Sequence, residues 1–549
     1  MLYLEAVKVE KYFSDRLILK FDDLKIYRGD KIGLIGANGA GKTTLLNILA
    51  GLVEPDRGFV KTYCNLAYIR QFLDEESIAS DQLPGTFNLD SDRKSNICSG
   101  GEQTQVKIAN ALNGAPQLLL ADEPTANLDY KHIKIFEQQL KKIDTIILVT
   151  HDRQLLDGLC NKTLEISDGQ IKSYQGNYSF YRQQKEHNLE RATLEYNKYE
   201  SEKAKLENAI SNQVRRSGSI KKTPRRMGNS EARLHKRAAN EKKEKLDGTV
   251  KSIATRLKKL EKKAKPRDVS SVKFDFSPTE LPQSRIIIKG CKFSYKYDAH
   301  LVFEQADFVV PRGLKTALWG DNGTGKTTLL NLITNGISGQ IKVVPKAMIG
   351  YFCQDFKNLD YNRTVLENVL GGSTVTQSEA RIILSRLLIG GDDVFKKVGV
   401  LSGGERIKVS FAKLFLSEAN VLLLDEPTNY LDIPSVEALE HVLKDYKGTV
   451  LFASHDRSFI DHVADRLLVV AEKKITAYEG HLCDYLQMQL REAQEEETKL
   501  EQIALKMRMA EIADKLGRPE ANKEALEEEY QKLVLRLNVL CQVILDSKV

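Results

Sequence analysis

The chain contains one glycine-rich motif twice, and this repeat restricts its fold more than any other feature. Residues 36–43 and 320–327 both fit the phosphate-loop pattern G-x-x-x-x-G-K-[ST]. Each copy follows an apolar run and precedes an apolar helical pattern, which predicts a strand, a glycine loop and a helix N-terminus that bind an anion. A chance glycine-rich turn is the alternative, with a weight of roughly one in ten for one bare match. It is negligible for two matches in the same context. The residues predicted to bind phosphate groups are Gly36, Asn38, Gly39, Gly41, Lys42, Thr43, Thr44, Gly320, Asn322, Gly323, Gly325, Lys326, Thr327 and Thr328.

Length and composition indicate a protein of several domains that does not cross a membrane. The chain has 549 residues, enough for two to four domains, and 29% of them are charged. No apolar run approaches the roughly 20 residues that span a bilayer, and the N-terminus lacks the layout of a signal peptide. The seven cysteines are scattered, with no C-x-x-C pair. We therefore expect a cytoplasmic protein without a disulfide framework or a zinc site.

A series of polar motifs follows each phosphate loop in the same order. Each half shows a glutamine after a predicted strand, then S-G-G-E, then an apolar strand that ends in Asp-Glu, and then a strand that ends before a histidine. An isolated Asp-Glu pair is usually a solvated strand end, and an isolated histidine is usually a surface residue. Because the motifs occur in the same order in both halves, these explanations for isolated residues do not account for them. The matching residues are Gln71, Ser99, Asp122, Glu123 and His151 in the first half and Gln354, Ser402, Asp425, Glu426 and His455 in the second.

This order resembles the ATP-binding-cassette (ABC) family, and the resemblance implies a role for each residue. ATP and Mg²⁺ would be the cofactors, and each serine motif would cap the nucleotide of the other cassette in an intramolecular sandwich. Phe13 would stack on adenine in the first site, with Tyr12 as the alternative, and Tyr295 would do so in the second. The catalytic residues would be Glu123, Glu426, His151 and His455, the metal residues Thr43, Gln71, Asp122, Thr327, Gln354 and Asp425, and the capping residues Ser99, Gly100, Gly101, Ser402, Gly403 and Gly404.

Positive charge is concentrated between the two halves. Residues 178–268 contain 26 Lys and Arg against 12 Asp and Glu, a net charge of +14, whereas the whole chain is +7. The composition favours helix, and we expect one helix from Tyr178 to about Ile210 and another from Glu231 to about Lys265. Apolar spacing predicts that they pair as a hairpin through Leu189, Leu194, Leu206, Leu234, Ile253, Leu257 and Leu260.

The tip of this hairpin, at about residues 211–230, carries three basic pairs with no acid between them. A solvated charged surface is the alternative, but such a cluster favours a phosphate backbone. Few aromatic residues occur there, so base stacking is not the expected mode. The candidate RNA-binding residues are Arg215, Arg216, Lys221, Lys222, Arg225 and Arg226.

The full arrangement resembles the ABC-F family, in particular its Vga-like antibiotic-resistance branch of ribosome protection proteins. The expected fold class is α/β, with two tandem phosphate-loop domains joined by a long helical hairpin and followed by a helical extension. The expected domains are residues 1–177, 178–268, 283–485 and 486–549. The second copy has 19 more residues than the first between its phosphate loop and its serine motif, so the first cassette is trimmed there.

The resemblance also implies a function. Such a protein binds the ribosome in its ATP state, reaches 23S rRNA near the peptidyl transferase centre, displaces P-site tRNA and drug, and hydrolyses ATP for release. The implied drugs are lincosamides, pleuromutilins and streptogramin A compounds, and the implied state is a monomer. The alternatives are a housekeeping ABC-F translation factor, an ATPase subunit of a membrane transporter, and a DNA-repair ATPase, although the last places its coiled coil inside a cassette.

Overall fold

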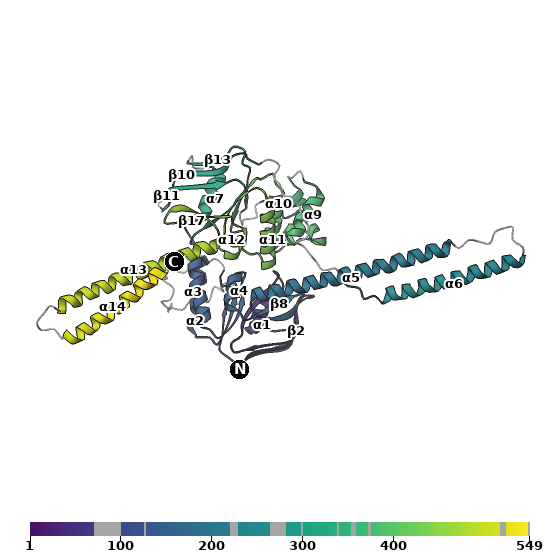
Figure 1. The fold of residues 1–549 in the computed structure, drawn as a ribbon, viewed down its shortest axis with the longest axis horizontal. Helices are drawn as coiled ribbons and strands as arrows, with labels where there is room; N and C mark the ends of the chain where they lie inside the picture. Colours follow the sequence, from purple (N-terminus) through teal and green to yellow (C-terminus); the bar gives the residue numbers. More distant parts are fainter. Residues whose placement is uncertain are drawn as a thin grey trace. The chain divides into compact units, whose positions relative to one another are not determined.

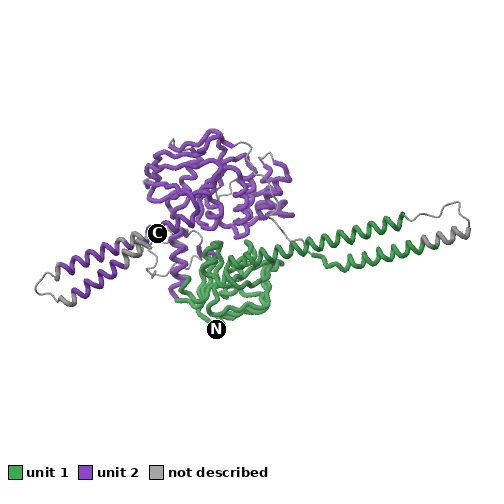
Figure 2. The backbone as a smooth tube through the Cα atoms, in the orientation of Figure 1, with its two compact units in different colours: residues 1–69, 115–122, 140–273 green, residues 70–114, 123–139, 274–549 purple. Residues whose placement is uncertain are grey.

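The computed structural model describes most of the chain in two compact units. The described residues are 1–70, 100–125, 128–219, 229–263, 281–297, 300–336, 340–352, 358–371, 375–516 and 523–546. Unit 1 comprises Met1–Ile69, Ala115–Asp122 and Leu140–Lys273, and unit 2 comprises Arg70–Gly114, Glu123–Gln139 and Phe274–Val549 (Figure 2). Among the described residues, no helix combines the length and apolarity required to cross a bilayer.

Unit 1 contains a small antiparallel sheet and a larger mixed sheet. The small sheet has the order β2-β1-β4, and the large one has the order β5-β6-β7-β3-β8-β9. The large sheet is parallel except for β9, which pairs antiparallel with β8. The strands are β1 (Leu2–Phe13), β2 (Arg16–Tyr27), β3 (Lys31–Gly36), β4 (Arg57–Thr62), β5 (Leu66–Ile69), β6 (Leu118–Asp122), β7 (Thr145–Val149), β8 (Lys162–Ser167) and β9 (Gln170–Gln175).

Unit 2 repeats this pair of sheets. The small sheet has the order β11-β10-β13, and the large one has the order β14-β15-β16-β12-β17-β18, again with an antiparallel last strand. The strands are β10 (Ile286–Tyr297), β11 (His300–Pro311), β12 (Lys315–Trp319), β13 (Ile341–Val343), β14 (Ile349–Phe352), β15 (Val421–Asp425), β16 (Thr449–Ala453), β17 (Arg466–Ala471) and β18 (Lys474–Glu479).

Helices follow the strands in the same order along the two copies, with additional helices in the second, and most of them are labelled in Figure 1. The first copy has α1 (Lys42–Leu49), α2 (Gly100–Asn113), α3 (Tyr130–Lys141) and α4 (Arg153–Leu159). The second has α7 (Lys326–Asn335), α8 (Val365–Leu370), α9 (Gln377–Arg386), the short 3-10 helices η3 (Gly391–Phe395) and η4 (Val398–Val400), α10 (Gly403–Phe415), α11 (Ile433–Asp445) and α12 (Arg457–Val463). Helices α8 and α9 lie within the longer segment that the sequence shows in the second copy.

The apolar runs before the Asp-Glu motifs form the cores of the large sheets. Leu118–Ala121 on β6 and residues 421–424 on β15 are all fully buried. Apolar and polar residues need not alternate along such strands, because both faces of a parallel sheet are covered. Each buried leucine contributes roughly 2 kcal/mol, so these strands hold the carboxylates at their ends on rigid supports.

The basic segment forms the predicted helical hairpin, made of α5 (Tyr178–Gly218) and α6 (Asn229–Lys259). The helices run antiparallel and are joined by an ion pair between Arg256 and Glu202 at 3.1 Å; just after α6, Lys263 pairs with Glu195 of α5 at 3.6 Å. The expected end of the first helix at Ile210 is wrong, because α5 continues to Gly218. Arg215 and Arg216 lie in its last turn, where cations interact favourably with the helix dipole.

Two of the predicted hairpin contacts are also wrong. Leu189 and Leu194 are exposed, at 41% and 61%, so they do not form a buried contact with α6. The tail forms a second pair of helices, α13 (Leu482–Leu516) and α14 (Lys523–Asp546). Helix α13 ends immediately before the Gly-Arg-Pro sequence that predicts a break there.

Candidate nucleotide-binding sites

The two phosphate loops have the same geometry. Lys42 Nζ donates to the carbonyl oxygens of Gly36 and Ala37, at 2.7 and 3.2 Å. Lys326 Nζ donates to the equivalent carbonyls of Gly320 and Asp321, at 2.8 and 2.9 Å. In both copies the ammonium group thus lies inside the loop, where it can exchange these carbonyls for phosphate oxygens.

Several loop glycines cannot be replaced without a clash or strain. Gly41 and Gly325 cap α1 and α7 with φ of 102° and 101°, in the region that favours glycine. A Cβ on Gly36 would lie 2.7 Å from the Ile166 carbonyl oxygen, and one on Gly320 would lie 2.5 Å from that of Val470. Gly39 and Gly323 also have positive φ but meet no neighbour within 4 Å, so their side of the loop is open to a ligand.

Hydroxyl and carboxylate groups of unit 2 converge at the start of α7. Thr327 Oγ1 donates to Asp425 Oδ1 at 3.1 Å, and Thr328 follows in the first turn. Burial raises the pKa of Asp425 despite the hydrogen bond from Thr327 and the charge of Lys326. A threonine hydroxyl and a carboxylate are hard oxygen ligands of the kind that Mg²⁺ prefers, so this donor set fits that ion.

Glu426 and His455 meet beside that carboxylate. The backbone N–H of His455 donates to Glu426 Oε2 at 3.3 Å, and its Nε2 lies 3.5 Å from Oε1. Burial raises the pKa of Glu426 to about 8, against the opposing charge of Lys326. Burial lowers the pKa of His455 to about 3, so the ring is neutral and the contact is not an ion pair.

Both glutamates have an unusual backbone conformation. Glu123 and Glu426 have φ of 49° and 46°, in a region that non-glycine residues seldom occupy. The Glu426 N–H donates to the carbonyl of Ala453 on the neighbouring strand β16, at 2.9 Å, which holds this turn. Such strain clusters at functional sites, and its presence in both copies indicates a shared constraint on where the carboxylate points. The sequence contains no signal for the positive φ of these two glutamates.

The first copy repeats the framework around its own residues. In unit 1, Asp122 is buried at the end of β6 and Lys42, Thr43 and Thr44 open α1. His151 follows β7, and the next residue, Asp152, caps α4 by accepting from the Leu155 N–H at 3.0 Å. Asp456 caps α12 in the same way through Phe459. The strand ends and helix caps around the two histidines are therefore equivalent.

Ser402 caps helix α10 rather than standing alone in a loop. Its Oγ accepts from the Glu405 N–H, and its own N–H donates to the Glu405 carboxylate at 2.8 Å, which makes a capping box. A Cβ added to Gly403 would meet no atom within 4 Å, so the helix N-terminus is open to an anion. In the first copy, Gly100 and Gly101 begin α2, and Ser99 lies outside the described residues.

In the second copy, the tyrosine that matches Phe13 in the strand register differs from the candidate Tyr295. Phe13 is the last residue of β1 and is 55% exposed; it pairs with Arg16. The matching last residue of β10 is Tyr297, which pairs with His300 and is 65% exposed. Tyr295 instead packs against the core of unit 2. The strand register thus places Tyr297, not Tyr295, at the position that matches Phe13. The sequence could have indicated this match, because Phe13 and Tyr297 each precede the next apolar pair by the same number of residues.

Some predicted residues lie outside the described part of the chain. These are Gln71, Gln354, Ser99, Lys221, Lys222, Arg225 and Arg226. Asn38 and Asn322 are described and lie in the turns of the two phosphate loops.

Unit 2 also contains a contact that no motif predicted. Asp129 follows the first Asp-Glu motif, and its Oδ2 accepts from the backbone N–H of Asn322 at 3.5 Å. Lys131 forms a 2.7 Å ion pair with Asp321, and Tyr130 packs edge-on against Trp319. These three residues therefore bring the segment after Glu123 to the second phosphate loop.

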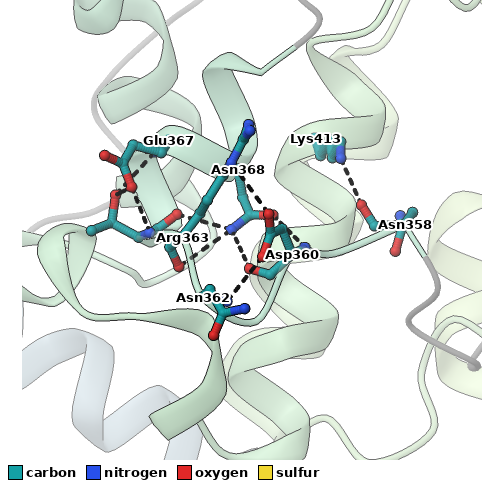
Figure 3. Close-up of polar contacts among 8 residues, drawn as sticks. Asn358, Asp360, Asn362, Arg363, Glu367, Asn368 and Lys413 are labelled. Atoms are coloured by element: carbon teal, nitrogen blue, oxygen red, sulfur yellow. Dashed lines mark hydrogen bonds and ion pairs between the residues drawn. The ribbon is translucent and has the colours of Figure 1, made fainter.

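One buried amide, that of Asn368, holds the described residues 358–364 (Figure 3). Asn368 accepts from the Asp360 N–H at 2.8 Å and donates to the carbonyls of Asp360 and Thr364 at 2.9 and 3.0 Å. Lys413 donates to the Asn358 carbonyl at 2.6 Å. Beside this loop lies a cavity of about 690 Å³ with mostly polar walls. The hydrogen bonds of Asn368 therefore fix residues 360–364, which come shortly after Gln354 in the sequence.

Sequence comparisons agree with the duplicated site. The ABC transporter family profile matches residues 19–126 and 303–429. The chain is 31% identical to the ribosome protection protein VmlR of Bacillus subtilis (strain 168), over 96% of each chain. It is 32% identical to the erythromycin resistance ATP-binding protein MsrA of Staphylococcus epidermidis, over 84% of this chain and 96% of the relative. It is 29% identical to ABC transporter F family member 5 of Arabidopsis thaliana, over 91% and 80%.

A solved structure shares the fold. The RNase-L inhibitor matches with a TM-score of 0.57 and 19% identity, over 85% of this chain and 89% of that one. The likeness confirms the predicted α/β class with two tandem ATP-binding domains. With full-length relatives above 30% identity and both sets of ATP-site motifs in place, the chain belongs to the ABC-F family and is an ATPase.

Proposed function

We propose that this protein binds the ribosome in its ATP state and protects it from antibiotics that act at the peptidyl transferase centre. The observation that carries the proposal is the combination of two complete ATP-site motif sets with a helical hairpin of net charge +14 in one chain. The relatives named for ribosome protection and erythromycin resistance support it. A basic hairpin suits a phosphate backbone, and a pair of ATPase sites suits a cycle of binding and release.

The finer assignments belong to the same proposal. Residues 1–177 and 283–485 are the two cassettes, residues 178–268 reach 23S rRNA and P-site tRNA, and residues 486–549 are an added helical element. The protein acts as a cytoplasmic monomer in which the two cassettes close on ATP as an intramolecular sandwich. The drugs are lincosamides, pleuromutilins and streptogramin A compounds, as in the Vga-like branch.

The site residues then have defined tasks. Lys42 and Lys326 leave their carbonyl partners to bind the outer phosphates, while the N-termini of α1 and α7 hold the phosphate chain. Thr327 and Asp425 hold Mg²⁺, as Thr43 and Asp122 do in the first site, and the bound ion supplies charge neutralisation on the phosphates. The serine motifs at α2 and α10 offer helix N-termini to the nucleotide.

The glutamates and histidines handle water and its proton. Glu426 orients the attacking water and accepts its proton, and Glu123 does the same in the first site. For that task Glu426 must lose the proton that burial favours in the nucleotide-free protein. Neutral His455, held at 3.5 Å from the glutamate, can donate a hydrogen bond to a phosphate oxygen. Phe13 and Tyr297 stack on the adenine rings.

The test uses the variant Glu123→Gln with Glu426→Gln, which retains shape but lacks the base. We expect it to co-sediment with ribosomes in ATP and not in ADP, and expression of the wild-type chain to raise the inhibitory concentration of the three drug classes. Matched controls are Lys42→Ala with Lys326→Ala, which should abolish both effects. Ribosome binding without drug protection would instead identify a housekeeping translation factor, and no ATP-dependent sedimentation would refute the proposal.

A further inference from the structure

Edge strand β4 presents aromatic and basic side chains in alternation on one face. Phe59, Lys61 and Tyr63 are two residues apart, and the backbone N–H of Tyr63 extends the ladder by donating to the Tyr3 carbonyl at 2.8 Å. Alternate residues of a strand share a face, and Val60 packs against the core from the other one. Phe59 and Tyr63 are each 50% exposed. We call these three residues the β4 face.

The cation of the β4 face is available to a ligand. The acids of the neighbouring strands have other partners: Glu5 and Asp23 pair with Lys25 at 3.6 and 3.1 Å. Glu10 pairs with Lys20 and Arg57. Although Lys61 lies opposite Glu5 in the ladder, no acidic group among the described residues forms an ion pair with it. Lys61 thus lies between two exposed aromatic residues along the strand.

The second copy shows that the fold does not require these aromatic residues. In β13, Lys342 lies opposite Lys289, as Lys61 lies opposite Glu5. The Val344 N–H donates to the Ile287 carbonyl, just as the Tyr63 N–H donates to the Tyr3 carbonyl, so Val344 matches Tyr63. By the same register, Gln340 matches Phe59. The same edge strand in unit 2 therefore keeps the lysine and has Gln and Val instead of the two rings.

Two explanations of the β4 face can be compared. Charged side chains on an edge strand oppose pairing with another chain, which accounts for the lysine in both copies. Edge protection does not account for two half-exposed rings on the same face of the strand, about 13 Å apart along it. Aromatic rings on an open sheet, with a cation between them, are the arrangement that stacks bases and binds the connecting phosphates of single-stranded RNA.

We propose that the β4 face binds an unpaired segment of RNA, as a second RNA contact separate from the basic hairpin. This inference rests on the proposed ribosome association, because the ribosome supplies the RNA. It differs from the hairpin contact in chemistry. The hairpin tip has few aromatic residues and relies on charge, whereas the β4 face combines stacking with a single cation and so depends less on salt than the tip does.

The first test is the affinity for an unstructured 12-nucleotide RNA, measured with the full chain by fluorescence anisotropy. Phe59→Gln with Tyr63→Val introduces the residues that the second copy uses, so the strand should still form and ATPase activity should be retained. We expect binding to weaken about tenfold. The aromatic exchange Phe59→Tyr with Tyr63→Phe should restore it. Unchanged affinity in the first variant overturns the proposal.

The second test locates the contact on the ribosome. A photo-cross-linking phenylalanine at position 59 is placed in the Glu123→Gln, Glu426→Gln chain, with the same group at Phe395, an exposed ring of unit 2, as the control. We expect a cross-link from position 59 to RNA and none from position 395. If the chain sediments with ribosomes but position 59 cross-links only to a ribosomal protein or to nothing, the β4 proposal fails. If the chain does not sediment, the proposed function fails, and the oligonucleotide result still judges the β4 face.

Discussion

Burial controls the protonation of single residues in the second site before any ligand enters. The carboxyl group of Glu426 has an ordinary pKa of 4.5 and a folded-state pKa of about 8. Between these pH values the folded protein holds a proton that the unfolded chain has lost. The free energy of unfolding must therefore fall as pH rises through this window. The positive φ of Glu426, 46°, also lowers the stability of the folded state. The backbone of the second site thus fixes the direction of the carboxylate at the expense of folding stability.

The variant Glu426→Gln removes this titration. In the nucleotide-free protein we expect its melting temperature to match that of the wild type near pH 5 and to exceed it increasingly toward pH 9, because the amide cannot ionise. The measurement is a series of thermal melts from pH 5 to pH 9. Glu367→Gln is the control, since this exposed carboxylate has a lowered pKa through its hydrogen bonds with Thr364. Its difference from the wild type should not change over that range, and a pH-independent Glu426→Gln difference would contradict the argument.

A second residue-scale prediction separates Tyr297 from Tyr295. Tyr297→Ala should raise the KM for ATP about tenfold and leave the melting temperature unchanged, because the exposed ring loses only its stacking. Tyr295→Ala should do the reverse, since that ring packs against Phe-rich core residues of unit 2 and its loss opens a gap. Steady-state ATPase kinetics and thermal melts distinguish the two. An increase in KM for Tyr295→Ala alone would restore Tyr295 as the adenine contact.

At the scale of elements, one half-buried carboxylate joins the hairpin to its cassette. Glu165 on β8 accepts from Tyr181 and Lys185 of α5, at 2.9 and 2.7 Å, and from Tyr174 of β9 at 3.2 Å. Burial alone would raise its pKa, but these donors together lower it. Helix α13 docks through the similar pair Tyr478 and Tyr485, with the apolar Val469 in the place of Glu165. The charged anchor is therefore special to the basic hairpin.

The variant Glu165→Val tests this anchor by copying the second cassette. We expect a loss of roughly 2 kcal/mol in stability, because the donors of Tyr181 and Lys185 lose a charged acceptor, and faster hydrogen exchange in the first turns of α5. A lowered pKa stabilises the fold above the ordinary value of 4.5, so the deficit should be full at neutral pH and vanish in acid. Glu195→Gln, in an exposed ion pair, should cost less than about 0.5 kcal/mol. Equal exchange rates in both variants would refute the anchor.

The elements also show how far sequence reasoning extends. Continuous apolar runs before the Asp-Glu motifs predicted buried parallel strands, because such runs have few alternative structures. The phosphate loops were predictable since glycine spacing reflects backbone conformations that no other residue allows. The end of α5 was missed because its last residues favour neither helix nor coil strongly. The sequence does not show which of Tyr295 and Tyr297 matches Phe13, because the two aromatic residues lie close together; the strand register shows that Tyr297 does and that Tyr295 packs against the core. The positive φ of the glutamates has no sequence signal.

At the scale of the whole molecule, charge is divided between parts. Residues 178–268 carry +14, so the remainder of the chain carries −7. This separation predicts that RNA contact by the hairpin depends on specific cations rather than on general attraction. Arg215 and Arg216 are exposed in the last turn of α5, close to the tip. Lys242 and Lys243 are equally exposed on α6, farther from the tip, and provide a control with the same loss of charge.

We therefore expect Arg215→Gln with Arg216→Gln to reduce drug protection while ATP hydrolysis in the absence of ribosomes stays at the wild-type rate, because neither residue touches a nucleotide site. The slope of the logarithm of ribosome affinity against the logarithm of salt concentration should become shallower, by an amount that corresponds to about two phosphate contacts. Lys242→Gln with Lys243→Gln should leave protection unchanged. The measurements are inhibitory concentrations in a drug-sensitive host, ATPase rates, and sedimentation across a salt series. If both pairs reduce protection equally, net charge alone drives the interaction and the tip has no special role; if only the arginine pair does, the hairpin acts through its end.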